Sequence, residues 1–510
     1  MDRLTQLPWT PFYTQAPADA VPPLADNDKL GAAYKQYALA ATIAFTVAVY
    51  SWEKHLDARQ KSAYLKTKFP SELEKTVSAI DKEREQHAMK EKEEKKDDTK
   101  GEKPKDDDDE NEKMHDPSKP LLPQLTEKFD KAQAYGLDKI NFGMFASTYD
   151  TIESIIFLML GFLPFAWDKS VELGAKYFAY SETENEIKIS LIFLAIITLV
   201  GTVTSLPFEL YSTFKIERKH GFNKQTIGLF VSDKIKSLIL TFAIGGPFVA
   251  LLLYIIMKGG DYFYLYVWAF MFVFSVFMMT IVPVFIMPLF NKYEPLEEGE
   301  LKKQIYALAD RLKYPLTKLF VMDGSKRSSH SNAFMFGFGN NKRIVLFDTL
   351  LKQVSRDEIL AILGHELGHW KMGHTLSNFI VTQLYFGAAF YAFALTYGSN
   401  ELYAAFGFND PNRPKPHIIA LMLFFQTLWA PVDKVLNFIL TVNSRRNEFQ
   451  ADKFSVDLGM SKKLQSALCK IHLENLGAMC PDPWYSMYHY SHPPLVERLS
   501  AMMSLDKKQS

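Results

Sequence analysis

Seven long apolar stretches, separated by polar segments, constrain this chain more than any other feature. Three of them contain no charged residue and are long enough for a membrane-spanning helix, which needs about 20 residues: Ile189–Phe208, Ser237–Met257 and Tyr262–Phe290. The other four are Gly31–Trp52, Ile152–Trp167, Leu376–Gly398 and Ile418–Leu440. The pattern predicts a mainly α-helical, polytopic membrane protein. Buried core helices of a large soluble protein are the alternative, which the length of the three best stretches disfavours.

Charged residues inside the weaker stretches bear on the interior of the helical bundle. Lys35 lies in the first stretch, Glu153 in the second, and Asp433 and Lys434 in the last. Charges at membrane depth usually face a bundle interior or a water-filled cavity, but long side chains near a helix end can also reach the interface. The sequence leaves both interpretations open.

One strongly charged segment stands apart from this apolar body. Between Asp81 and Lys113, 25 of the 33 residues are charged, and Lys82–Lys119 has almost no large apolar residue. Such a segment cannot bury a core, so we expect it to be disordered and to act as a solvated linker. Over the whole chain, 58 basic residues balance 58 acidic ones, which argues against nucleic acid as a partner.

The N-terminal residues and the two cysteines argue against a cleavable signal peptide, a disulfide scaffold and a Cys-rich zinc site. Residues 1–30 form a Pro-rich extension without the compact apolar core of a cleavable signal peptide, so the first apolar stretch would act as an uncleaved anchor. The two cysteines, Cys469 and Cys480, are too few for a disulfide scaffold or a Cys-rich zinc site. Two free thiols are favoured over a single bridge.

These features divide the chain into five regions. After residues 1–30, residues 31–290 would hold the first five spans and the charged insert. Residues 291–375 read as a folded polar module, with short strands at Leu319–Met322 and Arg343–Phe347 and a helix at Asp357–His374. Residues 376–440 would hold the last two spans, and residues 441–510 a mostly helical second polar region. Because two spans return the chain to the same side, the two polar regions can build one site.

The sharpest motif is His365-Glu366-Leu367-Gly368-His369, which follows an apolar helical run. Residues four apart lie on one face of a helix, so both imidazoles can bind one metal ion. Two histidines and one carboxylate suit Zn²⁺ and leave a fourth position for a water molecule, whose pKa the ion lowers toward about 7. Glu366 can then take the proton of that water. The alternative is a surface helix whose two histidines bind no metal ion.

A third metal ligand is expected from a second helix. Glu448 offers a carboxylate, and Asp452, four residues on, can accept a hydrogen bond from an imidazole N–H. Ordinary ion pairs are the alternatives for both residues, with Arg445 or Arg446 as partners of Glu448. His374 lies on a different helical face from His369, so we interpret it as a structural or supporting histidine rather than a ligand.

Several longer segments resemble the integral-membrane type I CaaX prenyl proteases. The similarity rests on HELGHW at His365–Trp370, SRRNEFQAD at Ser444–Asp452, GSKRSSHSNAF at Gly324–Phe334 and HYSHPPLVERL at His489–Leu499, and on KHGFNKQT at Lys219–Thr226 and NKRIVLFDTLL at Asn341–Leu351. The N-terminal residues and the charged insert depart from the family pattern.

The resemblance implies a seven-helix barrel around a large water-filled chamber, capped by the HExxH zinc metalloprotease domain. It implies one zinc ion per chain, held by His365, His369 and Glu448, with Glu366 as the catalytic base. Further site residues carry over by position: Asn332 to align the substrate backbone on an edge strand, His492 to polarise the scissile carbonyl, and Arg498 near the zinc-bound glutamate.

The residues themselves leave other roles open for these last three. His492 can serve only to cap a turn, Arg498 can pair with Glu497, and Asn332 can be a turn residue. A donor fixed at the carbonyl oxygen would contribute about 3–4 kcal/mol to peptide hydrolysis, and His492 or Arg498 could supply it.

The expected substrates follow from the resemblance alone. The family removes the last three residues from proteins that end in a prenylated Cys-a-a-X sequence, and a second, upstream cleavage of certain precursors is also known in it. The implied location is the endoplasmic reticulum membrane and the inner nuclear membrane continuous with it. The rival functions are a membrane quality-control metalloprotease that needs no prenyl group, and a transporter or receptor with a regulatory zinc site.

Overall fold

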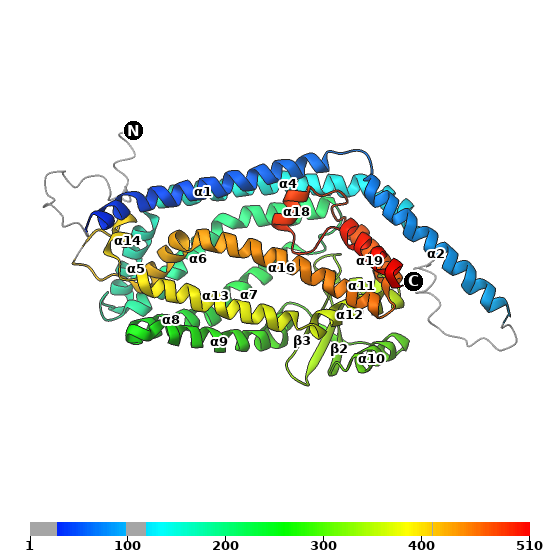
Figure 1. Cartoon of the computed structure of the whole chain (residues 1–510). Coiled ribbons are helices and arrows are strands. Elements are labelled where there is room, and N and C mark those ends of the chain that lie inside the picture. Colours follow the sequence, from blue (N-terminus) through cyan, green and yellow to red (C-terminus); the bar gives the residue numbers. More distant parts are fainter. Residues whose placement is uncertain (1–27, 98–118, 411, 510) are drawn as a thin grey trace.

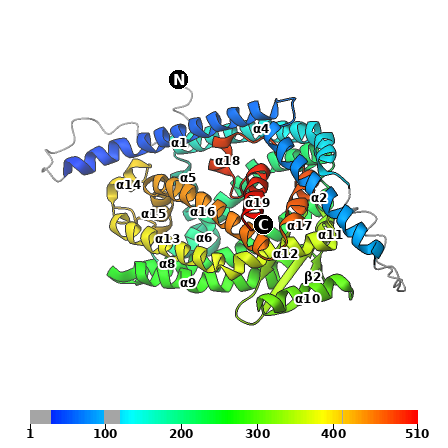
Figure 2. The ribbon, with the colours of Figure 1, turned by 45° about the vertical axis from the view of Figure 1, so that its right-hand side comes forward.

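Long helices running side by side make up most of the molecule, with a small sheet at one end (Figure 1). The computed structural model describes residues 28–97, 119–410 and 412–509. Nearly all of the expected N-terminal extension, 1–30, lies outside the described residues, because the first helix begins at Asp28. A view turned by 45° shows the same lengthwise helices beside the compact end that carries α10, α12, α17 and α19 (Figure 2).

In the N-terminal half, the regular elements of the described residues are helices. They are α1 (Asp28–Tyr64), α2 (Ser71–Asp97), α4 (Leu121–Met159), α5 (Phe162–Phe178), α6 (Glu186–Tyr211), α7 (Ile227–Leu240), α8 (Gly246–Lys258) and α9 (Phe263–Ile281). Short π-helical turns extend α6 through Ser212–Glu217, join α7 to α8 at Thr241–Gly245, and follow α9 at Val282–Ile286.

The C-terminal half adds the sheet and returns to the long helices once. Its first part is β1 (Tyr293–Pro295), α10 (Glu300–Leu312), β2 (Leu316–Met322), β3 (Ala333–Phe336), β4 (Lys342–Phe347), α11 (Asp348–Gln353) and α12 (Arg356–Lys371). Its second part is α13 (His374–Thr396), α14 (Asn400–Ala405), α15 (His417–Leu423), α16 (Ala430–Asp457), α17 (Ser461–Glu474), α18 (Pro483–His489) and α19 (Leu495–Gln509).

Four of the helical segments are long and apolar enough to cross a membrane: Glu186–Glu217, Ile227–Lys258, Gly260–Leu289 and His374–Thr396. In the most apolar part of each segment, no more than 22% of the residues are buried inside the protein. The core helices of a soluble protein would bury such apolar segments, so the alternative of a large soluble protein does not hold. Two bent helix pairs would raise the number of spans to six among the described residues. The predicted span Gly31–Trp52 is not among them, because polar residues within and beside this part of α1 lower its mean hydropathy. The seventh span therefore stays a prediction.

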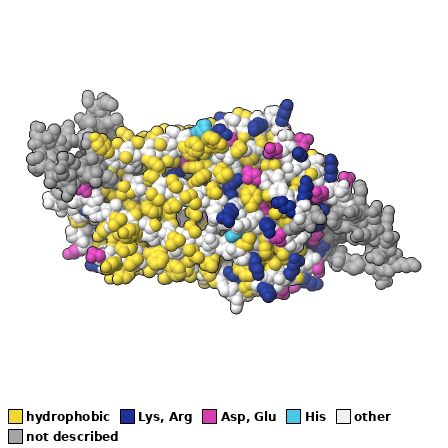
Figure 3. Space-filling model, viewed as in Figure 1, with side chains coloured by type: hydrophobic (Ala, Val, Ile, Leu, Met, Phe, Trp, Pro, Cys, Tyr) yellow, Lys and Arg dark blue, Asp and Glu magenta, His cyan; other side chains and the backbone are white. Residues whose placement is uncertain are grey.

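The surface of the molecule is divided in the same way. Hydrophobic side chains cover one face of the long-helix end almost continuously, while charged side chains gather at the end that carries α12 and α19 (Figure 3). Exposed apolar patches of this size on a soluble monomer are rare. The apolar surface is therefore the part that contacts lipid.

Two predicted spans are not single straight helices. Ile152–Trp167 crosses a bend of 66° between α4 and α5, where Gly161 has φ = 67°, a left-handed conformation that favours glycine. Ile418–Leu440 crosses a bend of 62° between the π-helical turn Phe424–Leu428 and α16. Pro431 lies in the first turn of α16 and has no N–H to continue the preceding helix. Hydrophobicity alone did not reveal these bends.

The charges inside the weaker spans have polar surroundings. Glu153 lines a cavity of about 420 Å³ together with threonine and glutamine side chains. Asp433 accepts a hydrogen bond from Tyr385 Oη (2.9 Å), and Lys434 pairs with Glu53 of α1 (2.9 Å). Glu153 thus faces a cavity, whereas Asp433 and Lys434 are held by neighbouring helices.

The expectation of disorder is wrong for the first part of the charged insert. Residues Lys82–Asp97 continue α2 as a helix, because Glu and Lys are good helix formers and the preceding turns are anchored. Asp81 accepts hydrogen bonds from the backbone N–H groups of Leu121 (2.8 Å) and Leu122 (2.9 Å), which are unpaired donors at the start of α4. Residues 98–118, the rest of the predicted linker, lie outside the described residues.

The small sheet supports the helix that carries the HExxH motif. Its strand order is β1-β2-β4-β3, with β2 and β4 parallel and the other pairs antiparallel, so β3 is an edge strand. The predicted strands at Leu319–Met322 and Arg343–Phe347 are confirmed within β2 and β4. Buried Ile344 and Leu346 of β4 pack in one cluster with Leu363 and Leu367 of α12. The sheet thereby fixes one side of α12.

Helix α12 begins with a capping box and ends earlier than expected. The N-cap Ser355 and Glu358 exchange the two hydrogen bonds of this motif. The helix ends at Lys371, Gly373 follows with φ = 71°, and His374 begins α13. The predicted helix Asp357–His374 therefore spans two elements.

Two glycines let α12 approach α16 closely. A Cβ at Gly368 would lie 3.1 Å from Phe454 Cβ and 3.3 Å from the Cα of Ala451, both in α16. A Cβ at Gly364 would lie 3.1 Å from Met460 Sδ. The Ser455 hydroxyl donates to the Ala361 carbonyl across the same contact (3.3 Å). These contacts set the distance between the two helices.

We expect the Gly368→Ala substitution to lower stability by about 1–3 kcal/mol, because the added methyl group overpacks the contact between α12 and α16. Thermal melting in detergent measures the effect. Gly201→Ala in α6 is the matched control, because a Cβ there meets nothing within 4 Å. Equal melting temperatures for the two variants would show that the close approach does not constrain the packing.

Glu358 gives a second prediction, on pH dependence. Burial opposes its ionisation, but Lys470 (2.8 Å), Ser466 and the Ser355 backbone outweigh this and lower the pKa below its ordinary value of 4.5. The stabilisation is therefore present above about pH 4.5 and is lost as the pH falls through the lowered pKa. We expect Glu358→Gln to cost about 3 kcal/mol at neutral pH, and melting curves should show the gap to wild type closing in acid. A gap that is constant with pH would contradict this.

Candidate active site

Three side chains of the predicted metal site converge from two helices. His365 and His369 lie on α12 and Glu448 on α16, and one ligand atom of each lies within 4.8 Å of the others. The Nε2 atoms of His365 and His369 are 3.2 Å apart. Glu448 Oε1 is 3.3 Å from His369 Nε2, and its Oε2 is 3.6 Å from His365 Nε2. The ligand atoms therefore face one common point.

The donor set fits a zinc ion. Two imidazole nitrogens and one carboxylate are the protein ligands of many catalytic zinc sites, with one position left open. Glu448 Oε2 is buried and accepts no hydrogen bond within the described part of the chain. A buried carboxylate oxygen without a hydrogen bond is costly unless a cation balances it. The geometry thus suits a metal ion at these three residues.

Asp452 and Arg498 contact the ligand residues and fix their orientation. Asp452 Oδ1 lies 2.9 Å from His365 Nδ1, on the side of the ring that faces away from Glu448. Arg498 donates to both carboxylate oxygens of Asp452, at 2.6 and 2.8 Å, and its Nη1 lies 3.4 Å from Glu448 Oε2. Asp452 thereby fixes the tautomer of His365, with Nε2 free to bind a cation.

The protonation of His365 reflects these neighbours. Burial lowers the pKa of its imidazole, but the nearby carboxylates of Asp452 (2.9 Å) and Glu448 (3.6 Å) outweigh burial and raise the pKa to about 9. A metal ion that binds Nε2 at neutral pH must therefore displace a proton.

His374 orients His369, and Gln450 in turn orients His374. His374 Nδ1 lies 2.9 Å from His369 Nδ1, and His374 Nε2 lies 2.9 Å from Gln450 Oε1. His374 is thus a supporting residue rather than a member of the ligand cluster, consistent with its interpretation from the sequence. Gln450 was missed, because a position two residues after Glu448 lies on a different face of α16 and gives no signal for this contact.

Glu366 lies between the two histidines and beside the metal cluster. Its side chain is half-buried and makes no hydrogen bond within the described part of the chain. Burial raises the pKa of its carboxyl, while the charges of His365 and His369 oppose this shift. A carboxylate with a raised pKa is the type of group that takes and returns protons near neutral pH.

His492 reaches the metal cluster, whereas Asn332 lies at the edge of the sheet. His492 is 66% exposed, with its Nε2 at 3.4 Å from Glu448 Oε1. Asn332 immediately precedes the edge strand β3, and its backbone carbonyl accepts a hydrogen bond from Phe347. The Asn332 side chain is exposed and accepts from the N–H of Ala333 (2.8 Å). The structure brings His492 to the cluster, and it puts Asn332 at the sheet edge.

The ion pair considered between Arg445 and Glu448 does not form, whereas Asp452 does form an ion pair, with Arg498. Arg445 pairs with Glu497 (2.9 Å). Arg445 therefore does not pair with Glu448, and Glu497 does not pair with Arg498. Cys469 and Cys480 are free thiols, which confirms the favoured interpretation.

Two family models match consecutive parts of the chain. Residues 113–292 match "CAAX prenyl protease N-terminal, five membrane helices", and residues 295–506 match "Peptidase family M48". The second match contains every residue of the candidate site.

Similar proteins match most of the chain. The CAAX prenyl protease 1 homolog of Oryza sativa subsp. japonica is 49% identical over 393 residues, which are 77% of this chain and 91% of that protein. The human homolog is 44% identical and the Saccharomyces cerevisiae CAAX prenyl protease 1 is 42% identical, over 74% and 75% of this chain and 87% of each relative.

The fold matches a solved structure as well. The crystal structure of S. mikatae Ste24p superposes with a TM-score of 0.77 at 38% sequence identity, and it covers 94% of this chain and 100% of that one. The expected mainly helical, polytopic membrane fold with a metalloprotease domain is thereby confirmed. The chain belongs to the CAAX prenyl protease 1 family, the M48 metallopeptidases with a multi-pass membrane N-terminal domain.

Proposed function

We propose that this protein is a zinc endopeptidase that removes the C-terminal aaX tripeptide from prenylated CaaX proteins. The observation that carries the proposal is the convergence of His365, His369 and Glu448 around one point, with Glu366 next to His365 in α12. Relatives named CAAX prenyl proteases, at 40–49% identity, support the substrate class. One zinc ion per chain would be held by these three ligands.

The chain's own residues divide the work of hydrolysis. A bound zinc ion would supply Lewis-acid polarisation and would lower the pKa of water at the site. Glu366 takes a proton from the attacking water and delivers it to the leaving amine. His492 donates a hydrogen bond to the carbonyl oxygen as negative charge develops there. Arg498, through Asp452, keeps His365 in the tautomer that binds the ion.

Substrate alignment follows from the sheet. β3 is an edge strand, so its outer backbone groups are free to pair with an extended peptide. Asn332, at the start of this strand, is the residue we assign to align the backbone of the substrate. A lipidated tail suits an enzyme whose apolar surface lies in a bilayer (Figure 3).

Two further parts of the proposal rest on the family resemblance alone. One is the location in the endoplasmic reticulum membrane and the inner nuclear membrane continuous with it. The other is a second, upstream cleavage of some precursors.

The test is cleavage of farnesylated and unprenylated CaaX peptides by purified, detergent-solubilised protein, with zinc content measured in parallel. We expect wild type to cleave the farnesylated peptide after the prenyl-cysteine. We expect Glu366→Gln to lose at least ~10²-fold in kcat with its zinc retained, because Glu366 transfers protons and is not a ligand. Glu297→Gln, a change of an exposed glutamate on the same domain, is the control.

Other outcomes would overturn parts of this proposal. Equal cleavage of both peptides would favour a quality-control protease that does not require prenylation. Zinc in both proteins without cleavage of any peptide would favour a receptor or transporter. Full turnover by Glu366→Gln would remove Glu366 from the mechanism.

A separate prediction concerns His492. We expect His492→Ala to lower kcat about 10²- to 10³-fold, the usual cost of losing one donor to the oxyanion, with little change in KM or in zinc content. Steady-state kinetics of peptide cleavage measure this. His489→Ala serves as the control, because His489 lies in the same segment at the end of α18. A change confined to KM would assign His492 to substrate binding instead.

A further inference from the structure

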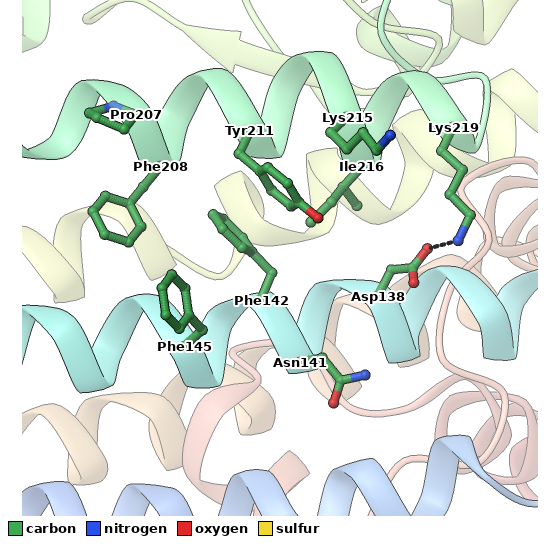
Figure 4. Close-up of a pocket in the computed structure, with 10 residues that line it drawn as sticks. All are labelled: Asp138, Asn141, Phe142, Phe145, Pro207, Phe208, Tyr211, Lys215, Ile216 and Lys219. Atoms are coloured by element: carbon green, nitrogen blue, oxygen red, sulfur yellow. Dashed lines mark hydrogen bonds and ion pairs between the residues drawn. The ribbon is translucent and has the colours of Figure 1, made fainter.

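A groove that the catalytic proposal does not use lies between α4 and α6 (Figure 4). It has a volume of about 590 Å³, within the range of about 300–1,000 Å³ that is usual for small-molecule sites. Phe142 and Phe145 of α4 and Phe208 and Tyr211 of α6 form its apolar part. Phe142 stacks on Tyr211 at a centroid distance of 4.8 Å.

The groove opens on the lipid-facing side of α4. Phe145 belongs to a stripe at helical spacing with Ile152 and Ile156, and these side chains are 64%, 53% and 46% exposed. Lys139 and Ser147 lie on another face of α4, where they line a separate cavity together with His330. Apolar side chains exposed along a membrane helix contact acyl chains, so the apolar part of the groove is continuous with the bilayer.

One end of the groove is basic. Pro207, Tyr211, Lys215 and Lys219 follow one another at intervals of four residues along α6 and its π-helical extension, and all of them line the groove. Lys219 is paired with Asp138 of α4 (2.6 Å), which closes this end. Lys215 is exposed, and within the described residues it has no ion-pair or hydrogen-bond partner for its ammonium group.

The basic end also lies where a membrane surface is expected. Lys215 lies near the C-terminal end of the candidate span Glu186–Glu217, and Arg218 and Lys219 follow directly. Basic residues just outside a span attract anionic lipid headgroups, by about 1 kcal/mol for each Lys or Arg. Figure 4 shows the ring of Phe208 and the rings of Phe142 and Phe145 lying between the two helices, with the lysines at one end.

We propose that this groove binds an anionic phospholipid of the surrounding bilayer. Its phosphate accepts hydrogen bonds from Lys215, and one acyl chain lies along Phe142, Phe145 and Phe208. Charge complementarity selects this occupant, because a prenyl chain carries no charge to balance Lys215 and a zwitterionic headgroup balances it only in part. The site is distinct from the catalytic cluster and does not depend on the proposed peptidase activity.

The test is native mass spectrometry of the full-length protein in detergent, with phosphatidylserine or phosphatidylcholine of identical acyl chains added. We expect wild type to retain phosphatidylserine in preference to phosphatidylcholine. Lys215→Gln should weaken phosphatidylserine binding about fivefold, the equivalent of one basic contact, and Lys215→Arg should keep the preference. Phe145→Ala should weaken the binding of both lipids.

Lys258→Gln is the matched control, since Lys258 is an exposed basic residue at the end of another apolar helix and does not line the groove. Melting temperatures close to wild type show that the variants are folded. The proposal is overturned if wild type has no preference for phosphatidylserine, if Lys215→Gln behaves like Lys258→Gln, or if only detergent is retained. Displacement of the lipid by a farnesylated peptide would assign the groove to the substrate's prenyl chain and would also overturn it.

Discussion

The contact between α12 and α16 is the interaction on which the candidate site depends. It joins residues 365–369 to residue 448, although two long apolar helical segments separate them in the sequence. The absence of a Cβ at Gly364 and Gly368 lets the helices approach until the ligand atoms of His365, His369 and Glu448 lie within 4.8 Å of one another. The membrane helices therefore act as the support that returns the chain to the same side and brings the two halves of the site together.

Charge balance explains why this contact tolerates so many ionisable groups. Asp452 and Arg498 are almost fully buried, and a buried charge is destabilising unless it is paired and hydrogen-bonded. Arg498 meets this requirement with two hydrogen bonds to Asp452. Asp452 in turn contacts His365 Nδ1 and orients its ring. Glu448 Oε2 accepts no hydrogen bond among the described residues, and Arg498 Nη1, 3.4 Å away, balances its charge only in part, which leaves an electrostatic imbalance. A divalent cation at the ligand cluster would remove it, so the electrostatics and the donor geometry support the same conclusion.

Local sequence patterns predicted four of the seven spans and the HExxH helix, because hydrophobic length and i, i+4 spacing are properties of single segments. The bends at Gly161 and Pro431 were missed, since apolar composition does not report a change of helix direction. The helix at Lys82–Asp97 was missed for a related reason: its charges signal solvation, whereas Asp81 anchors it to α4 through a contact distant in sequence. Gln450 acts through His374, a contact between two helices that spacing along one helix cannot indicate. The roles of Asn332 and His492 came from the resemblance, and they stay predictions.

The central claim is that His365, His369 and Glu448 bind one zinc ion at an open coordination site. X-ray absorption at the zinc edge on the purified protein tests it most directly. The account predicts one zinc per chain with two imidazole nitrogens at about 2.0–2.1 Å and the remaining ligands oxygen. A sulfur ligand at about 2.3 Å, or a protein that cleaves peptides without stoichiometric metal, would contradict it.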